Sequence, residues 1–346
     1  MLRMDRVYPD AAVGPEQARL DSQAPSSRRR PEGSAVLNVG IDIGGTKIAG
    51  GVVDAAGGIL DKRRVDTPVE VPALVDAVVA MAEELRSRHD VTAIGVAAAG
   101  FIDRDRSTVI HAPNIAWRNE PLRAVLESRL HAPVSIENDA NAAGWGEFRF
   151  GAGRGRSHMV MLTMGTGVGG AVVSDGALYR GGFGSGGELG HVRFLRDGLL
   201  CGCGQKGCLE QYASGRALQR EAAEIAARGG IGQALADVRD ADGTIHGADI
   251  SRLVEAGDPG ALEALRRVAS ALGEACGGFQ AVLDPEVFVI GGGVAQLGDV
   301  VLESVRAAYA ASLPGGGDRP MAEFALARLG NDAGLIGVAD LAGRGR

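Results

Sequence analysis

The sequence predicts an α/β protein made of two similar halves. From residue 35 the chain reads as three strands followed by alternating helix and strand, and this order begins again at residue 159. At a fixed offset of 120, five of the nine residues 45–53 match residues 165–173: Gly45, Thr46, Gly50, Val52 and Val53 recur as Gly165, Thr166, Gly170, Val172 and Val173. The matches indicate a duplicated unit.

Apolar periodicity defines the elements of the first half. Residues 35–43 form a buried strand that ends in a glycine turn, and residues 48–54 and 59–66 alternate as two further strands. Residues 72–88 have apolar side chains at helical spacing, at Leu74, Val75, Val78, Val79 and Leu85. A strand over 92–98, a helix over 121–131 and a strand over 133–137 complete this half.

The second half begins with an apolar strand over 159–164, which ends in Gly165-Thr166-Gly167, and a second strand segment follows at 171–173. Amphipathic helices are predicted next, and then a strand that runs into a glycine cluster. The expected elements are helices 214–228 and 260–283, strand 286–290, helix 298–312, strand 322–328 and helix 333–342.

Composition excludes several classes of protein. The formal net charge of −7 argues against nucleic acid as the main partner, and no apolar run is long enough to span a membrane. Residues 1–34 are rich in Pro, Ser, Gln and Arg and lack apolar periodicity, so we expect a disordered leader. The chain is therefore expected to be cytoplasmic, with reduced thiols.

Three of the four cysteines lie within eight residues, in the pattern His191-x9-Cys201-x-Cys203-x4-Cys208. Three thiolates and one imidazole complete a tetrahedral shell for Zn²⁺ and leave no position for water, so the predicted site is structural. The alternatives are a disulfide, for which Cys201 and Cys203 are too close, or plain buried thiols. Cys276 lies in an apolar run and is expected to be a core residue.

Two glycine turns end the first strand of each half, Asp42-Ile43-Gly44-Gly45-Thr46-Lys47 and Gly165-Thr166-Gly167. Glycine lets backbone N–H groups approach an anion, so two such turns facing each other would bind a phosphate chain; the alternative is a pair of tight hairpin turns. Residues 165–170 also match G-x-G-x-x-G, but that dinucleotide motif requires a helix where this chain continues as a strand. A third cluster, Gly291-Gly292-Gly293, offers a backbone surface for a nucleoside.

A polar cluster, Glu137-Asn138-Asp139-Ala140-Asn141, follows the strand 133–137. Ligands of open α/β folds bind at the carboxyl ends of strands. Asp139 could therefore be the N-cap of the next helix or a general base in a cleft, and Asn138 could provide the cap instead.

These motifs, taken in order, resemble the ROK family of sugar kinases and repressors over about residues 36–342, and the actinobacterial glucokinase branch in particular. The resemblance also includes Ala112-Pro113-Asn114-Ile115-Ala116-Trp117, Glu188-Leu189-Gly190-His191 and the Cys201–Glu210 run. It implies an actin-like ATPase (ribonuclease H-like) fold with two halves around a cleft. The expected domains are 35–142, joined by the C-terminal helix 333–346, and 143–332, which carries the zinc loop 191–208.

The resemblance also implies the roles of the site residues. Asp139 corresponds to the catalytic aspartate, and Asn114, Asn138, Asp139, Glu188, His191 and Glu210 to positions that hold sugar hydroxyls. The nucleotide side comprises Asp42, Gly44, Gly45, Thr46, Lys47, Gly165, Thr166, Gly167, Gly291, Gly292 and Gly293. His191 would bind zinc through one ring nitrogen, together with Cys201, Cys203 and Cys208, and could reach the sugar through the other.

The expected activity is phosphoryl transfer from ATP with Mg²⁺ to the 6-hydroxyl of glucose, by a homodimer or homotetramer. Another hexose (fructose, mannose or an N-acetylated hexosamine) or polyphosphate as donor remains open; Arg149, Arg154 and Arg156 are the basic residues that a polyphosphate track could use. A sugar-responsive repressor is the other class, but only 34 residues without helical pattern precede the fold.

Overall fold

The fold is described from a computed structural model that covers residues 36–112, 115–313, 315–316 and 319–345. The predicted leader, residues 1–34, lies outside the described residues, as does Asn114. Over the described ranges, no helix is long and apolar enough to cross a membrane.

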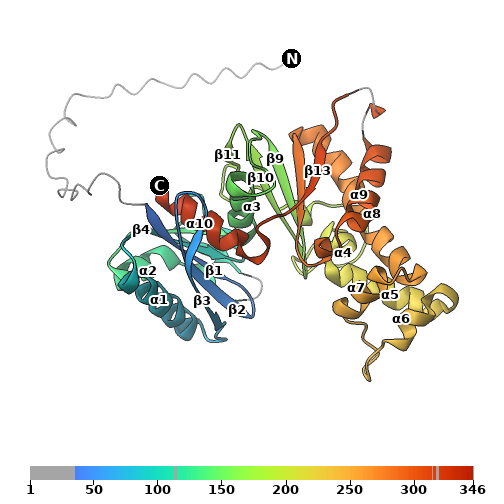
Figure 1. Cartoon of the computed structure of the whole chain (residues 1–346), viewed down its shortest axis with the longest axis horizontal. Coiled ribbons are helices and arrows are strands. Elements are labelled where there is room, and N and C mark those ends of the chain that lie inside the picture. Colours follow the sequence, from blue (N-terminus) through green and yellow to red (C-terminus); the bar gives the residue numbers. More distant parts are fainter. Residues whose placement is uncertain (1–35, 113–114, 314, 317–318, 346) are drawn as a thin grey trace, which may run out of the picture. The chain divides into compact units, whose positions relative to one another are not determined.

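The first half contains a five-stranded sheet of order β3-β2-β1-β4-β8, of which β1 to β4 are labelled in Figure 1. Strand β1 pairs antiparallel with β2 and parallel with β4, and β4 pairs parallel with β8. The strands are β1 (Leu37–Ile43), β2 (Lys47–Val53), β3 (Ile59–Asp66), β4 (Val91–Ala98) and β8 (Val134–Asn138). The carboxyl ends of β1, β4 and β8 therefore lie at one edge of the sheet, where Asp42 and Asn138 are found.

The second sheet repeats this topology with the order β11-β10-β9-β12-β13. Strand β9 pairs antiparallel with β10 and parallel with β12, which in turn pairs parallel with β13. Its strands are β9 (Met159–Met164), β10 (Val168–Ser174), β11 (Ala177–Leu178), β12 (Val287–Gly291) and β13 (Glu323–Leu326). Matching order and direction in both sheets confirm the duplicated unit that the 120-residue offset predicted.

Helices pack on each sheet through their apolar faces. In the first half, α1 (Val71–Arg88) buries all five of the residues expected from its periodicity, and α2 (Leu122–Leu130) packs beside it. In the second half, α8 (Pro259–Leu283) and α9 (Asp299–Ser312) pack on each other and on the sheet core. The other α-helices described there are α4 (Glu210–Ala213), α5 (Gly215–Arg228), α6 (Gln233–Asp237) and α7 (Gly247–Glu255).

Two helices connect the halves, α3 (Asp139–Phe150) and α10 (Ala333–Gly343). A Cβ atom added at Gly337 would lie 1.8 Å from the Ala142 carbonyl oxygen, and one added at Gly40 would lie 2.0 Å from that of Leu335. Helix α10 therefore packs backbone to backbone against both α3 and β1. This close approach requires glycine at both positions.

The smallest strands were not predicted from the sequence. A three-stranded sheet of β5 (Phe101–Ile102), β6 (Val109–His111) and β7 (Arg118–Glu120) lies between β4 and α2. Strands of two or three residues are too short to show alternation. The strand predicted at 171–173 is longer in the structure, where β10 begins at Val168 and includes Gly169 and Gly170. These two glycines have no side chains, so they do not show the apolar pattern of a strand.

Glu147 of α3 is fully buried and joins this helix to the segment that leads into α10. Its Oε1 accepts the N–H groups of Arg328 (2.8 Å) and Leu329 (2.7 Å), and its Oε2 accepts that of Ala152 (2.8 Å). We expect Glu147→Ala to lower the free energy of unfolding by about 3 kcal/mol or more, because buried N–H groups lose their acceptor.

Urea unfolding would measure this loss. The matched control is Glu224→Ala, which removes an exposed i,i+4 partner of Arg228 and is expected to cost about 0.5 kcal/mol or less. Equal losses in the two variants would contradict the role assigned to Glu147.

Candidate active site

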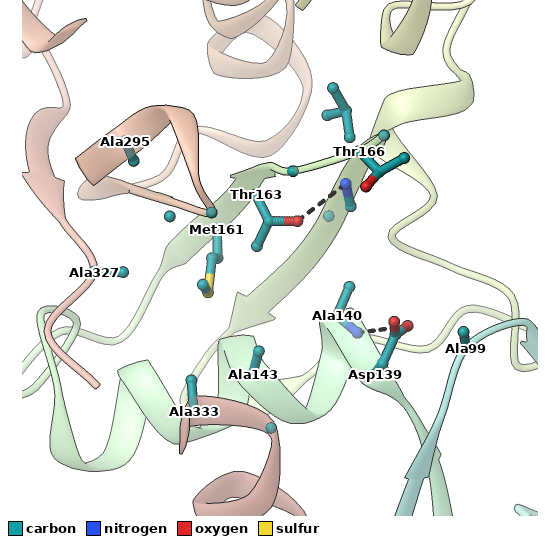
Figure 2. A pocket seen from close by; sticks show the side chains of 18 of the residues that line it. Ala99, Asp139, Ala140, Ala143, Met161, Thr163, Thr166, Ala295, Ala327 and Ala333 are labelled. Atoms are coloured by element: carbon teal, nitrogen blue, oxygen red, sulfur yellow. Dashed lines mark hydrogen bonds between the residues drawn. The ribbon is translucent and has the colours of Figure 1, made fainter. Parts of the chain in front are cut away.

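A cavity of about 670 Å³ is lined by residues from both sheets, at the carboxyl ends of β1, β8, β9 and β12 (Figure 2). Most of the predicted site residues meet there. The predicted residues in its wall are Asp42, Gly44, Asn138, Asp139, Gly165, Thr166, Gly167, Glu188, His191, Glu210, Gly291 and Gly292. Such a concave wall, shared by both sheets and carrying a few convergent polar groups, is typical of a ligand site.

Asp139 is the first residue of α3, and Asn138 is its N-cap. The Asn138 Oδ1 accepts the Asn141 N–H at 2.9 Å, and its Nδ2 donates to the Gly100 carbonyl at 3.0 Å. The cap is therefore supplied by Asn138, which leaves the Asp139 carboxylate in the cavity, where its Oδ1 accepts the Ala140 N–H at 2.9 Å (Figure 2). Burial raises the pKa of Asp139. The hydrogen bonds that its carboxylate accepts from the backbone N–H groups of Ala140 and Asp139 oppose this rise.

Two further carboxyl groups, those of Asp42 and Glu188, line the cavity with Asp139. Burial raises the pKa of Asp42 to about 7, with further contributions from the negative charges of Asp139 and Asp332. Burial likewise raises the pKa of Glu188 to about 7, and the charges of Asp139 and Glu210 add to this rise. A cluster of like charges held out of water favours a ligand that brings hydrogen-bond donors or cations.

The glycine segments of the second half line the same cavity. Gly165 and Gly167 form the turn between β9 and β10, and the Gly165 N–H donates to the Gly167 carbonyl at 3.0 Å. The Val168 N–H donates to Glu210 Oε2 at 3.3 Å, so this turn is in contact with the carboxylate that follows the cysteines. Gly291 and Gly292 line the wall at the end of β12.

Four predicted nucleotide residues do not line this cavity: Gly45, Thr46, Lys47 and Gly293. The ammonium group of Lys47 forms an ion pair with Asp66. Gly293 lines a second cavity of about 590 Å³, which shares Gly165, Thr166 and Gln296 with the first. Arg216 and Gln219 of α5 and Ser251 of α7 line the second cavity as well.

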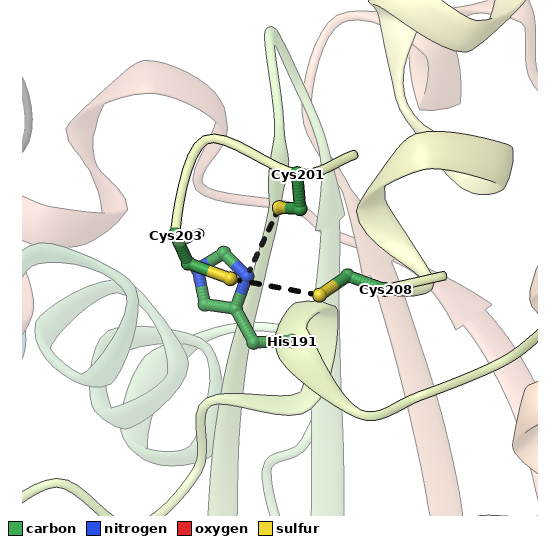
Figure 3. A group of neighbouring side chains, drawn as sticks. All are labelled: His191, Cys201, Cys203 and Cys208. Carbon is green, nitrogen blue, oxygen red and sulfur yellow. Dashed lines mark hydrogen bonds between the residues drawn. The ribbon is translucent and has the colours of Figure 1, made fainter. Parts of the chain in front are cut away.

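The four predicted zinc ligands form one cluster, in which their ligand atoms all lie within 4.8 Å of one another (Figure 3). The distance from Cys201 Sγ to His191 Nδ1 is 3.7 Å, and Cys203 Sγ lies 3.6 Å from Cys208 Sγ. Burial raises the pKa of Cys208 to about 12, so this thiol requires a cation nearby to become a thiolate. Cys201 Sγ also lies 3.5 Å from Glu210 Oε1, which joins the cluster to the cavity wall. Cys276 is a buried core residue, as predicted.

The three arginines considered for a polyphosphate track do not line either cavity. Nε of Arg149 lies 3.4 Å from Oδ2 of Asp340, and Arg156 forms an ion pair with Glu323.

Two parts of the site had no signal in the sequence. Phe101 of the small sheet lines the cavity and stacks on His111, with ring centroids 6.3 Å apart. Arg180 forms an ion pair with Glu137, the residue that precedes Asn138 and Asp139 in the chain. Arg180 is an isolated arginine before a glycine run, and Phe101 belongs to a strand too short to predict.

Comparison with known proteins agrees with this geometry. The sequence profile of the ROK family matches residues 38–344. A glucokinase of Streptomyces coelicolor is 47% identical over 310 residues, which cover 88% of this chain and 97% of that protein. The crystal structure of a ROK family glucokinase from Streptomyces griseus in complex with glucose and AMPPNP has a TM-score of 0.81 and 46% identity, and the match covers 89% of this chain and all of that one.

A ROK hexokinase structure from Thermus thermophilus has a TM-score of 0.75 at 37% identity, and the match covers 89% of this chain and 98% of that one. The family profile spans both sheets and the cavity between their strand ends. The chain therefore belongs to the ROK family, with the actin-like α/β fold of its sugar kinases.

Proposed function

We propose that this protein is a glucokinase, which transfers the γ-phosphoryl group of ATP to the 6-hydroxyl of glucose. The observation that carries the proposal is the convergence of Asp139, Glu188, His191 and Glu210 with the Gly165–Gly167 turn in one cavity. Glucose and AMPPNP, the ligands of the Streptomyces griseus relative, are a hydroxyl-rich sugar and an ATP analogue, which is what this wall would accommodate.

The sugar side needs hydrogen-bond acceptors, because glucose is neutral and covered with hydroxyl groups. Glu188, Glu210 and Asp139 supply carboxylate oxygens, and the remaining Nδ2 hydrogen of Asn138 can supply a donor. With Nδ1 of His191 beside Cys201, Nε2 is left to face the sugar. Asn114, which lies outside the described residues, remains a proposed sugar contact.

In the proposed reaction, Asp139 accepts the proton of the 6-hydroxyl as that oxygen attacks the γ-phosphorus and ADP leaves. The raised pKa of Asp139 makes it a stronger base than an exposed aspartate. Mg²⁺ bound with ATP would neutralise charge on the transferring phosphoryl group. Asp42, at the end of β1, is the carboxylate suited to hold that ion, while the N–H groups of the Gly165–Gly167 turn would hold phosphate oxygens.

The second cavity is suited to the nucleoside of the donor. It continues from the Gly165-Thr166 turn and is lined by Gly293, as expected of the adenosine side, together with Arg216, Gln219 and Ser251. We also propose that residues 35–142 with 333–346, and residues 143–332, act as two domains that close on the substrates and exclude water.

The cysteine cluster fits Zn²⁺. Tetrahedral ligands about 2.3 Å from zinc lie about 3.8 Å from one another, close to the 3.6 and 3.7 Å separations in this cluster. With no open position, zinc would supply rigidity rather than chemistry. The chain from Glu188 to Glu210 would then be fixed in its binding geometry before glucose arrives.

The raised pKa values predict how the reaction depends on pH. Asp42 and Glu188, with pKa values of about 7, are neutral below that pH and cannot act as carboxylate acceptors or cation ligands. We therefore expect kcat/KM for glucose to rise between pH 6 and 8.

Initial rates across this range would test the expectation, and Glu188→Gln should flatten the part of the profile that is due to Glu188. A flat wild-type profile would contradict it. The effect on folding has the opposite sign: both groups bind protons more tightly in the folded state, so their contribution to stability is present below pH 4 and is lost as the pH rises through 7.

The experiment that tests the proposed function is a coupled assay over a panel of hexoses, with ATP and polyphosphate as alternative donors. We expect the highest kcat/KM for glucose with ATP. Preference for fructose, mannose or an N-acetylated hexosamine, or faster reaction with polyphosphate, would assign the site to that substrate instead.

A further inference from the structure

An ion pair between the half-buried Arg180 and the buried Glu137 joins the two halves next to the active site. Glu137 is the residue before Asn138 in β8, and its side chain is 3% exposed. Nε of Arg180 donates to Glu137 Oε2 at 2.7 Å, and Nη2 of Arg180 lies 2.6 Å from the same oxygen. The other oxygen, Oε1, accepts the Asn138 N–H and the Asn141 Nδ2, both at 3.2 Å. Glu137 thus contacts the start of α3 on one side and Arg180 on the other.

Arg180 begins a segment that has few side chains to hold it in place. Five of the seven residues 181–187 are glycine, and the φ angles of Gly181, Gly184 and Gly187 lie between 69° and 100°. The side chain of Phe183 is 88% exposed, so it does not anchor the segment in a core. A glycine-rich segment loses much conformational entropy when it is ordered, and few side chains here offset that cost.

The segment leads directly to Glu188. The Gly186 N–H donates to the Arg180 carbonyl at 2.8 Å, which closes the segment on Arg180 itself. In its middle, a Cβ atom added at Gly184 would lie 2.6 Å from the Arg104 nitrogen, so the segment also lies against the turn after β5. The Leu189 N–H then donates to the Gly187 carbonyl at 2.7 Å, at the start of the 3₁₀ helix Leu189–His191. The position of Arg180 therefore influences that of Glu188, eight residues later.

We propose that Glu137 and Arg180 are a positioning pair, which holds the glycine-rich segment 181–187 and thereby places Glu188 opposite Asp139 for sugar binding. The inference rests on the proposed function of the cavity, and it adds residues that do not touch the substrate. If the pair is broken, the segment samples other conformations, and the apparent affinity for glucose falls by the fraction of molecules that remain competent.

The test variant is Arg180→Met, which retains a long apolar side chain and removes the charge. We expect the KM for glucose to rise about tenfold or more, which corresponds to one competent molecule in ten, while the KM for ATP changes less than about twofold. The matched control is Arg156→Met, which breaks the exposed pair with Glu323 and should leave both KM values unchanged.

A second variant separates positioning from stability. Arg180→Met alone leaves the Glu137 carboxylate buried without its cation and should lower the Tm. The double variant Glu137→Gln with Arg180→Met removes both charges and should recover much of the Tm, while the KM for glucose stays high. Recovery of both values, or a wild-type KM for glucose in folded Arg180→Met, would overturn the inference.

The outcomes also distinguish this inference from the proposed function. If the wild-type protein does not phosphorylate glucose, the proposed function fails. If the wild-type protein is active and the variants bind glucose as well as it does, only the positioning role fails. If Arg180→Met does not fold, Arg180→Lys retains the charge but loses the two-nitrogen contact, and we expect it to raise the KM for glucose at least about threefold. A wild-type value in that variant would count against the pair.

Discussion

Replacing Asp139 by asparagine is expected to lower kcat by about 10³-fold, because an amide cannot accept the proton of the attacking hydroxyl. Glucose should still bind with an affinity within about tenfold of wild type, since asparagine keeps one acceptor oxygen in the same place. The fold should be retained as well, because the cap of α3 is supplied by Asn138.

Steady-state rates and a glucose titration on the same sample would measure the two effects. Asp175→Asn is a matched control, since Asp175 lies in the exposed turn after β10 and its left-handed φ of 51° is one that asparagine tolerates. A kcat within tenfold of wild type for Asp139→Asn would reject Asp139 as the base.

Loss of the proposed zinc site is expected to have the second large effect. Cys208→Ser should release the metal and lower the affinity for glucose by about 100-fold or more, because Glu188, His191 and Glu210 all lie on or beside the segment that the cluster holds. Oε1 of Glu210 lies 3.5 Å from Cys201 Sγ, so disorder in the cysteine loop would reach the sugar wall directly.

Elemental analysis and glucose titration would test this expectation. Cys276→Ala is the matched control, since it removes a buried cysteine of α8 that lies outside the cluster and should retain the metal. Fully active protein that contains no zinc would contradict the structural role proposed for the cluster.

The sequence predicted most of the strands and helices of five or more residues, although α6 and α7 were not expected. It also predicted the site residues that lie next to one another in short motifs. Helix α1 and strand β1 begin within two residues of their expected starts. The sequence could not tell whether Asn138 or Asp139 is the N-cap of α3, because both residue types can cap a helix. The structure identifies Asn138, because its Oδ1 accepts the Asn141 N–H.

Contacts between residues far apart in the chain could not be predicted. Glu147 accepts hydrogen bonds from the N–H groups of Arg328 and Leu329, which are more than 180 positions away in the sequence. Arg180 is 43 positions from Glu137. Lys47 has the sequence position of a phosphate-binding lysine, yet its pairing with Asp66 depends on the register of β2 against β3. Such pairs are set by sheet topology, which no local motif encodes.

We infer that one cavity brings the 6-hydroxyl of the sugar to residue 139 and the donor phosphate to the Gly165–Gly167 turn. A crystal structure of Asp139→Asn with glucose and AMPPNP would test it most directly. We expect the 6-hydroxyl within hydrogen-bond distance of the side chain of residue 139, and γ-phosphate oxygens at the turn. A sugar bound elsewhere, or oriented with its 6-hydroxyl away from that side chain, would contradict the account.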